Sequence, residues 1–259
     1  MPLPQTKVNE LMDILIPYVD AGEVINEFRL ASIRRDINKL PFLEDKLQLQ
    51  ALCYAASGDV ANAKQYFQRA FELYPDVVIA QNYRTYINQQ HDYPLVVSLT
   101  YMYAGMFEEP KFVKEAYDTS LFFEHDLVKA NVYLEKYLKY LPEEHRMAAT
   151  EEYKNEKESV LNMLSVIGLS EDVLPLISSL GHSIARDNNI GLIRNNLYLH
   201  ENLLAVEFEV EKKYSSRLSD VNFKLAMHIA EDETLFDKPL TALFRTTNDN
   251  VAPDEHVGA

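Results

Sequence analysis

Tryptophan is absent from this chain of 259 residues, and cysteine occurs only once, at position 53. A single cysteine excludes an internal disulfide and any metal cluster built from several cysteines, which suits a reducing compartment. We expect Cys53 to be a small buried side chain in a helix. No apolar run reaches the 18 residues that a membrane-spanning helix needs, and the apolar stretch 11–19 lacks the flanking features of a signal peptide. These absences predict a cytoplasmic protein.

Basic residues are also scarce. The chain has 25 Lys and Arg against 40 Asp and Glu, a formal charge of −15, and no run of Lys or Arg longer than two. Such a surface repels phosphate backbones and anionic lipids. We therefore expect neither nucleic acid nor a membrane as a partner.

Motifs that carry chemistry are missing as well. The sequence has no glycine-rich phosphate loop, no GxSxG, no HExxH, and no two histidines spaced to bind zinc on one helical face. It therefore predicts no catalytic residue, no cofactor and no metal, and a protein that is not an enzyme. The alternative is an enzyme whose site lies near the C-terminus, around His200, Glu201, His228 or Arg245.

What the sequence does contain is helical periodicity with regular punctuation. Glycine occurs only seven times, and apolar residues recur at spacings of three and four up to about residue 185. Prolines stand at 41, 75, 110 and 142, at intervals of 34, 35 and 32 residues. Because proline ends a helix, a regular interval predicts structural units of equal length.

The best-formed unit spans residues 44–77. Small residues are needed where two helices cross closely, and aromatic residues fill the space beside them. The positions that follow this pattern are Ala51, Tyr54, Gly58, Ala63, Phe67, Ala70 and Pro75. The unit resembles a tetratricopeptide repeat, although Leu47 stands where that family often has tryptophan. The neighbouring units are less regular, since Arg29 and Asp36 occupy positions that usually hold small residues.

The pattern changes after residue 186. Residues 203–211 alternate between apolar and acidic, which predicts a strand with one face in water. A helix starting near Ser219, a strand over 239–247, and a hairpin turn at His200, Glu201 and Asn202 complete a small module. The predicted fold is mainly α: an α-solenoid of three to four tetratricopeptide-like hairpins (1–186), a small α+β module (187–247) and a flexible tail (248–259).

The resemblance implies that the first helix of each unit lines an inner groove. In the regular unit this surface would include Gln48, Leu52, Ala55 and Ala56. In the next two units the partner-binding residues would be Asn82, Tyr86, Gln89, Gln90, Phe112, Glu115, Thr119, Phe122 and Phe123. Exposed rings with amides are suited to hold a peptide, and the alternative is that the rings form a core. A clamp for a terminal carboxylate is disfavoured, because Gln48 and Leu52 stand where the family's clamp has cationic and amide side chains.

The sequence therefore predicts a non-enzymatic scaffold or adaptor that docks another protein. The partner would bind as a peptide or helix in the groove, or as an added strand on the edge of the C-terminal module that contains 203–211, which could also join two copies of the chain. The alternative is an acidic regulator, chaperone or inhibitor of a basic enzyme or toxin.

Overall fold

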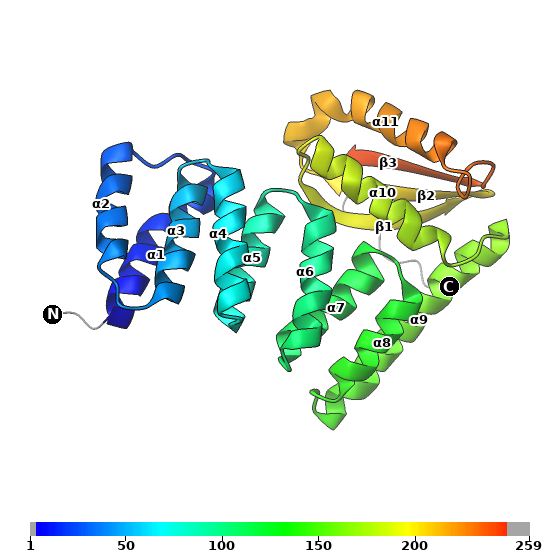
Figure 1. The fold of residues 1–259 in the computed structure, drawn as a ribbon. Coiled ribbons are helices and arrows are strands. Elements are labelled where there is room, and N and C mark those ends of the chain that lie inside the picture. Colours follow the sequence, from blue (N-terminus) through cyan, green and yellow to red (C-terminus); the bar gives the residue numbers. More distant parts are fainter. Residues whose placement is uncertain (1–3, 248–259) are drawn as a thin grey trace. The chain divides into compact units, whose positions relative to one another are not determined.

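The computed structural model describes residues 4–247, and its contacts divide the chain into an N-terminal unit, Met1–Gln89, and a C-terminal unit, Gln90–Ala259. The fold is mainly helical with one small sheet near the C-terminus, as predicted (Figure 1). The long helical region ends at Asp187, next to the predicted domain boundary at residue 186. The division of the chain into two folding units at that boundary stays a prediction. The predicted tail, 248–259, lies outside the described residues.

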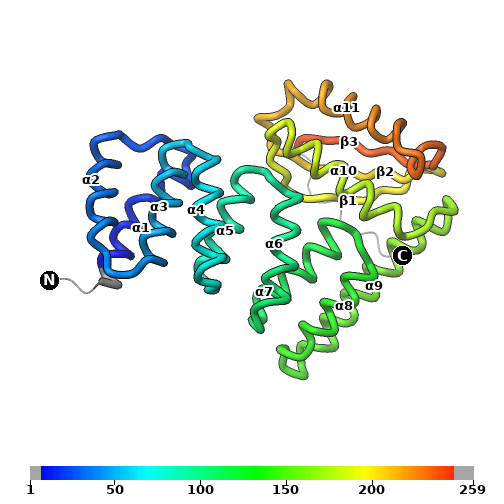
Figure 2. Tube along the Cα trace, viewed as in Figure 1, coloured from blue at the N-terminus to red at the C-terminus, as the bar shows by residue number. Residues whose placement is uncertain are grey.

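The N-terminal unit consists of five helices. They are α1 (Pro4–Ala21), α2 (Glu27–Asn38), α3 (Leu43–Ala56), α4 (Val60–Leu73) and α5 (Val77–Gln89). Helices α3 and α4 are antiparallel neighbours, α1 and α2 both contact α3, and α5 contacts α4 (Figure 2). The α3/α4 hairpin coincides with the unit predicted over 44–77.

Small side chains form the contact between α3 and α4. Ala51, Ala63 and Ala70 are fully buried, as is the ring of Phe67 beside them. Gly58 makes the turn with a φ of +76°, a conformation that glycine adopts without steric cost. Cys53 is buried, as expected for a small apolar group.

Helices also begin the C-terminal unit. They are α6 (Tyr93–Met106), α7 (Pro110–Asp118), the π-helical segment η1 (Thr119–Phe123), α8 (Leu127–Leu138), α9 (Glu143–Ile167) and α10 (Val173–Asp187). Each of the four punctuating prolines lies at a boundary between two helices, and α3, α5, α7 and α9 each begin at such a proline or within two residues after it. The division into repeat units of equal length stays a prediction. Helix α10 contacts α6, α11 and β2, so it belongs to the layer that covers the sheet.

The sheet has three strands in the order β1-β2-β3. Strand β1 (Leu192–His200) pairs antiparallel with β2 (Leu203–Val210) through a turn at Glu201 and Asn202. After the 3-10 segment η2 (Lys212–Arg217), helix α11 (Leu218–Glu231) leads to β3 (Leu240–Thr246), which pairs parallel with β2. The predicted hairpin, helix and final strand are all confirmed.

One face of the sheet carries the core. Val206, Phe208 and Val210 are fully buried, and the ring of Phe208 stacks on that of Phe244 at 5.1 Å. The prediction that the opposite face of β2 is in water is wrong for Glu207 and Glu209, which are 7% and 6% exposed. These carboxylates are covered by arginines of the adjacent strands, since Glu207 pairs with Arg245 and Glu209 with Arg194.

Helix α10 approaches β2 closely at Gly181, where any Cβ would overlap the ring of Phe208. We expect Gly181→Ala to destabilise the protein by about 1–3 kcal/mol, because the ring must leave its place in the core. The matched control is Gly105→Ala in α6, where no atom lies within 4 Å of the new Cβ. There we expect a change of no more than about 1 kcal/mol, in the stabilising direction. Urea denaturation compares the two variants, and equal midpoints would contradict the close approach.

Candidate functional site

A recess of about 720 Å³ lies in the N-terminal unit, between α1, α3, the segment 73–76 and the start of α5. Ligand sites of proteins commonly have volumes of this size. We call it the acidic recess, and it is lined by Val8, Asn9, Met12, Glu44, Asp45, Gln48, Leu73, Tyr74, Pro75, Asp76, Val78 and Ile79. Most of these side chains are apolar, and three are carboxylates.

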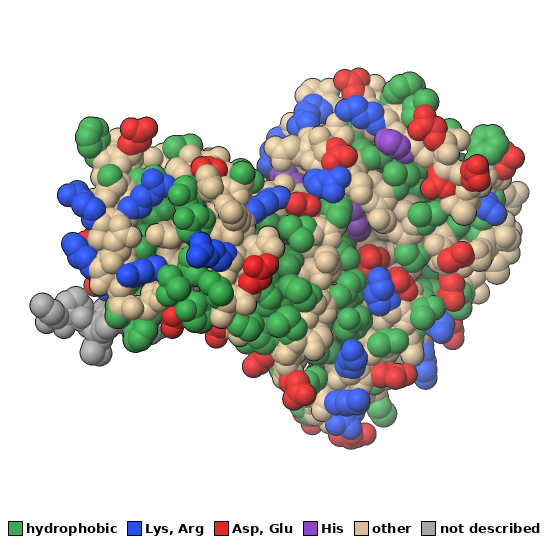
Figure 3. All heavy atoms as spheres, in the orientation of Figure 1, with side chains coloured by type: hydrophobic (Ala, Val, Ile, Leu, Met, Phe, Trp, Pro, Cys, Tyr) green, Lys and Arg blue, Asp and Glu red, His purple; other side chains and the backbone are tan. Residues whose placement is uncertain are grey.

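The carboxylates of Glu44 and Asp45 lie in the first turn of α3, where the helix dipole favours negative charge. Burial and then the charge of Glu44 raise the pKa of the Asp45 carboxyl. Lysine and arginine side chains are spread over the α2–α4 face of this unit (Figure 3), yet among the described residues none forms an ion pair with Glu44 or Asp45. Asp76 has a structural role, since its Oδ1 accepts a hydrogen bond of 2.7 Å from the backbone N–H of Val78.

Gln48 contributes a buried amide to the wall of the acidic recess. Its side chain is 4% exposed, and within the described part of the chain its Nε2 has no hydrogen-bond acceptor. Buried donors are nearly always satisfied, so the Nε2 of Gln48 is an exception that a bound water or a bound group would satisfy. Sequence reasoning placed Gln48 on the inner groove without identifying the acidic residues beside it.

A second recess, of about 70 Å³, lies between α1, α3, α4 and α5 and brings three predicted binding residues together. We call it the tyrosine recess, and it is lined by Ile16, Val19, Asp20, Leu52, Phe67, Asn82, Thr85, Tyr86 and Gln89. Nε2 of Gln89 donates to Oδ1 of Asp20 at 2.8 Å. The expectation of an exposed Tyr86 ring is wrong, because it is 3% exposed and lies 5.3 Å from the Phe67 ring. Its burial raises the pKa of Tyr86 to about 12.

The other predicted binding residues belong to the C-terminal unit. The expectation of an exposed ring is wrong for Phe112, which is fully buried between Tyr103 and Phe107. Phe123 stacks on His182 with ring centroids 3.9 Å apart, whereas Phe122 is 40% exposed. The polar residues Gln90, Glu115 and Thr119 are half-buried. These side chains do not form one continuous aromatic surface, because α7 turns its rings into the core.

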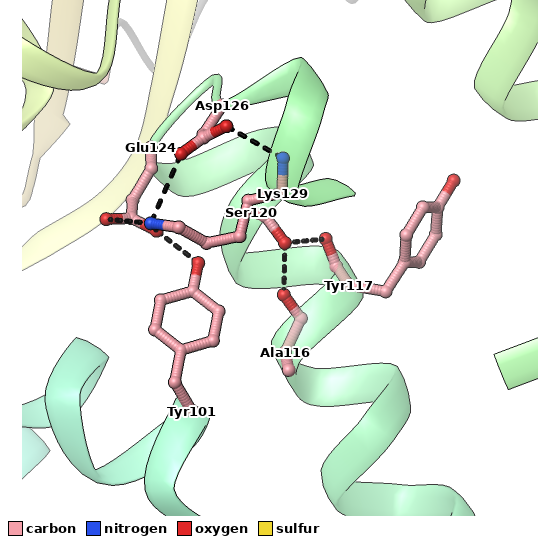
Figure 4. Close-up of polar contacts among 7 residues, drawn as sticks. All are labelled: Tyr101, Ala116, Tyr117, Ser120, Glu124, Asp126 and Lys129. Carbon is pink, nitrogen blue, oxygen red and sulfur yellow. Dashed lines mark hydrogen bonds and ion pairs between the residues drawn. The ribbon is translucent and has the colours of Figure 1, made fainter. Parts of the chain in front are cut away.

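A charged network surrounds the π-helical segment η1 (Figure 4). Lys129 on α8 lies 3.2 Å from carboxylate oxygens of both Glu124 and Asp126, and its Nζ is 4.6 Å from the centre of the Tyr101 ring. The Tyr101 hydroxyl donates to Glu124, and burial raises the pKa of that hydroxyl well above its usual range. Each charge therefore has a partner within the network. We interpret this network as a structural link that holds α6, η1 and α8 together.

Two buried histidines lie beside the same segment. Burial lowers the pKa of His125 to about 4 and that of His182 to about 3. Nδ2 of Asn195 lies 3.0 Å from Nε2 of His182, so the neutral ring can accept this hydrogen bond. The histidines are 57 positions apart in the sequence, and no local pattern indicates that both are buried.

The four residues of the enzyme alternative are not brought together. His200 and Glu201 lie at an exposed turn, Arg245 pairs with Glu207, and His228 lies on the exposed side of α11. Within residues 4–247, no hydrogen bond or ion pair joins any two of these four. The same range has no group of three or more His, Cys, Asp or Glu that could hold a metal ion.

Both recesses combine apolar walls with carboxylates and amides. Within residues 4–247, no helix combines the length and apolar character needed to cross a bilayer. Comparison with protein-family models, with curated proteins and with solved structures finds no match for this chain.

The buried histidines predict a loss of stability in acid. The unfolded chain binds protons at the ordinary histidine pKa of 6.5, whereas folded His125 binds one only near pH 4. As the pH falls through this window, each of the two histidines should remove about 1.4 kcal/mol of stability per pH unit.

Replacement of His125 tests this directly. Its φ of +54° favours asparagine as the substitute, because asparagine tolerates the left-handed region. We expect urea midpoints of His125→Asn to fall less steeply between pH 6.5 and about 4 than those of the wild type. The control His145→Asn changes an exposed residue and should keep the wild-type slope. An unchanged slope in His125→Asn would contradict a buried neutral imidazole.

Proposed function

We propose that this protein is a non-enzymatic scaffold that docks a segment of a partner protein on the α1/α3/α5 face of its N-terminal unit. The observation that carries the proposal is that both recesses lie along these three helices. The odd-numbered helices of this unit are also the ones that the resemblance to tetratricopeptide repeats assigns to the inner groove. Adaptor, chaperone and regulator roles all need such a surface.

The chemistry of this face supports binding rather than catalysis. Apolar side chains such as Met12 and Val78 offer area that a partner can bury, and amides such as Asn82 can bond to its backbone. Among the described residues, no hydroxyl group of the two recesses donates a hydrogen bond to a carboxylate, the contact that would activate a nucleophile. The cytoplasm remains our proposed location.

A regulator of a basic partner is the second candidate, and the formal charge of −15 favours it. Long-range attraction between opposite charges raises the rate of association and weakens as salt screens it. Strand addition or pairing of two copies at the outer strand β1 is a further way to dock, since Ile193 and Tyr198 there are about half-exposed.

Two matched lysine substitutions test the scaffold proposal. Val78 is 53% exposed in the acidic recess, and Val24 is 70% exposed outside both recesses of the same unit. Each replacement by lysine adds the same charge at an exposed valine. We expect full-length protein with Val24→Lys to retain the same proteins from a native extract as the wild type. Val78→Lys should lose at least one of them by about tenfold or more, the effect of a hot-spot residue.

Quantitative mass spectrometry of the retained proteins provides the measurement, and circular dichroism checks that both variants fold. If no protein distinguishes Val78→Lys from Val24→Lys, this face is not the docking surface.

A further inference from the structure

The acidic recess has a chemical character that narrows the kind of partner, and this inference rests on the proposed function. Part of its wall is apolar, since α1 contributes Val8 and Met12 and α5 contributes Val78 and Ile79. Its volume of about 720 Å³ holds several side chains of a bound segment. An apolar segment therefore fits the walls. The polar groups of the recess determine which charge and which hydrogen-bonding groups that segment must have.

The first polar feature of the acidic recess is a pair of carboxylates, Glu44 and Asp45, without a basic partner among the described residues. Several buried or half-buried acids elsewhere in the described chain have basic partners: Glu207 has Arg245, Glu209 has Arg194, and Glu124 has Lys129. Glu44 and Asp45 are half-buried neighbours in the acidic recess and have no such partner among the described residues. The raised pKa of Asp45 reflects this situation, because burial and a like charge both disfavour its ionised form. A bound cation would reverse the effect.

Gln48 is the second and independent feature. It lies one helical turn after Glu44 and lines the same recess, and its Nε2 donor is enclosed without an acceptor. A carbonyl oxygen of a bound backbone can accept from this donor after a small side-chain rotation. A segment of protein offers such carbonyls at every residue, which an isolated amine does not.

We propose that the acidic recess binds a segment of a partner protein in which a lysine or arginine stands between apolar residues. The cation lies against Glu44 and Asp45, the apolar neighbours lie against α1 and α5, and a backbone carbonyl accepts from Gln48. Anionic segments are excluded, because they would bring a further negative charge to a recess that already contains three carboxylates.

The test uses two short peptides as probes, acetyl-Ala-Leu-Lys-Leu-Ala-amide and the same peptide with glutamate in place of lysine. Each is titrated at millimolar concentrations into the ¹⁵N-labelled full-length protein, a range that detects weak single-segment binding. We expect the lysine peptide to shift the backbone amides of Glu44, Asp45 and Val78 and the side-chain amide of Gln48. The glutamate peptide should bind at least tenfold more weakly. Equal affinities, or no shifts with the lysine peptide, would overturn the proposal.

Near-isosteric variants assign the effect to the recess. Glu44→Gln combined with Asp45→Asn should weaken binding of the lysine peptide at least tenfold. The control Glu27→Gln removes an acid from the first turn of α2, outside the acidic recess, and should leave the affinity unchanged. Gln48→Leu should raise the urea midpoint, since it removes an unsatisfied donor, while it weakens binding several-fold. A Gln48→Leu protein that binds as tightly as the wild type would refute the role of the amide.

The experiment with the native extract distinguishes a failure of this inference from a failure of the proposed function. If Val78→Lys loses a partner that the Glu44→Gln/Asp45→Asn variant keeps, the face is a docking surface but the charge specificity is wrong. If Val78→Lys keeps all partners, the proposed function itself is wrong, whatever the peptides show.

Discussion

The ring of Phe67 is the contact on which the organisation of the N-terminal unit depends. It comes from α4, is fully buried, and lies within 5.9 Å of the rings of Tyr83 and Tyr86 on α5. The alanines of the α3/α4 contact leave the space that this ring fills, because a larger side chain would hold the two helices apart. The same ring lines the tyrosine recess. The ring of Phe67 therefore contributes both to packing within the α3/α4 hairpin and to the shape of the proposed docking face, α1/α3/α5.

A second constraint is the compensation of buried charge. Several acids that are shielded from solvent in the C-terminal unit have a cation alongside, as Glu124 has Lys129 and Glu209 has Arg194. Removing one member of such a pair leaves the other charge uncompensated, so these pairs act as structural elements. Glu44 and Asp45 in the N-terminal unit have no such partner among the described residues. The contrast explains why the acidic recess, rather than the network around η1, is the place to look for a ligand.

Much of the fold could be predicted because its signals are local. The alternation over 203–210 requires only that neighbouring side chains point to opposite faces, and the hairpin over 44–77 requires only helical spacing with glycine at the turn. The proposed docking face, α1/α3/α5, was harder to predict. Spacing placed Gln48, Asn82 and Gln89 on the recess-forming helices, but it could not separate an exposed ring from a buried one. Phe112 and Tyr86 would have the same sequence periodicity whether their rings were exposed or buried. Only the residues that pack against each ring in space decide its burial.

By itself, the sequence determined the helical character, the starts of several helices, the β-hairpin and the final strand as separate elements, and the excess of negative charge. Each of these follows from composition or from interactions a few residues apart. Tertiary structure alone decided that Phe123 stacks on His182, that Glu207 and Glu209 are covered by arginines, and that Glu44, Asp45 and Gln48 line a recess with residues of α1 and α5. Those outcomes depend on contacts between distant segments, whose geometry is set by how side chains fill the space between helices and not by any local pattern.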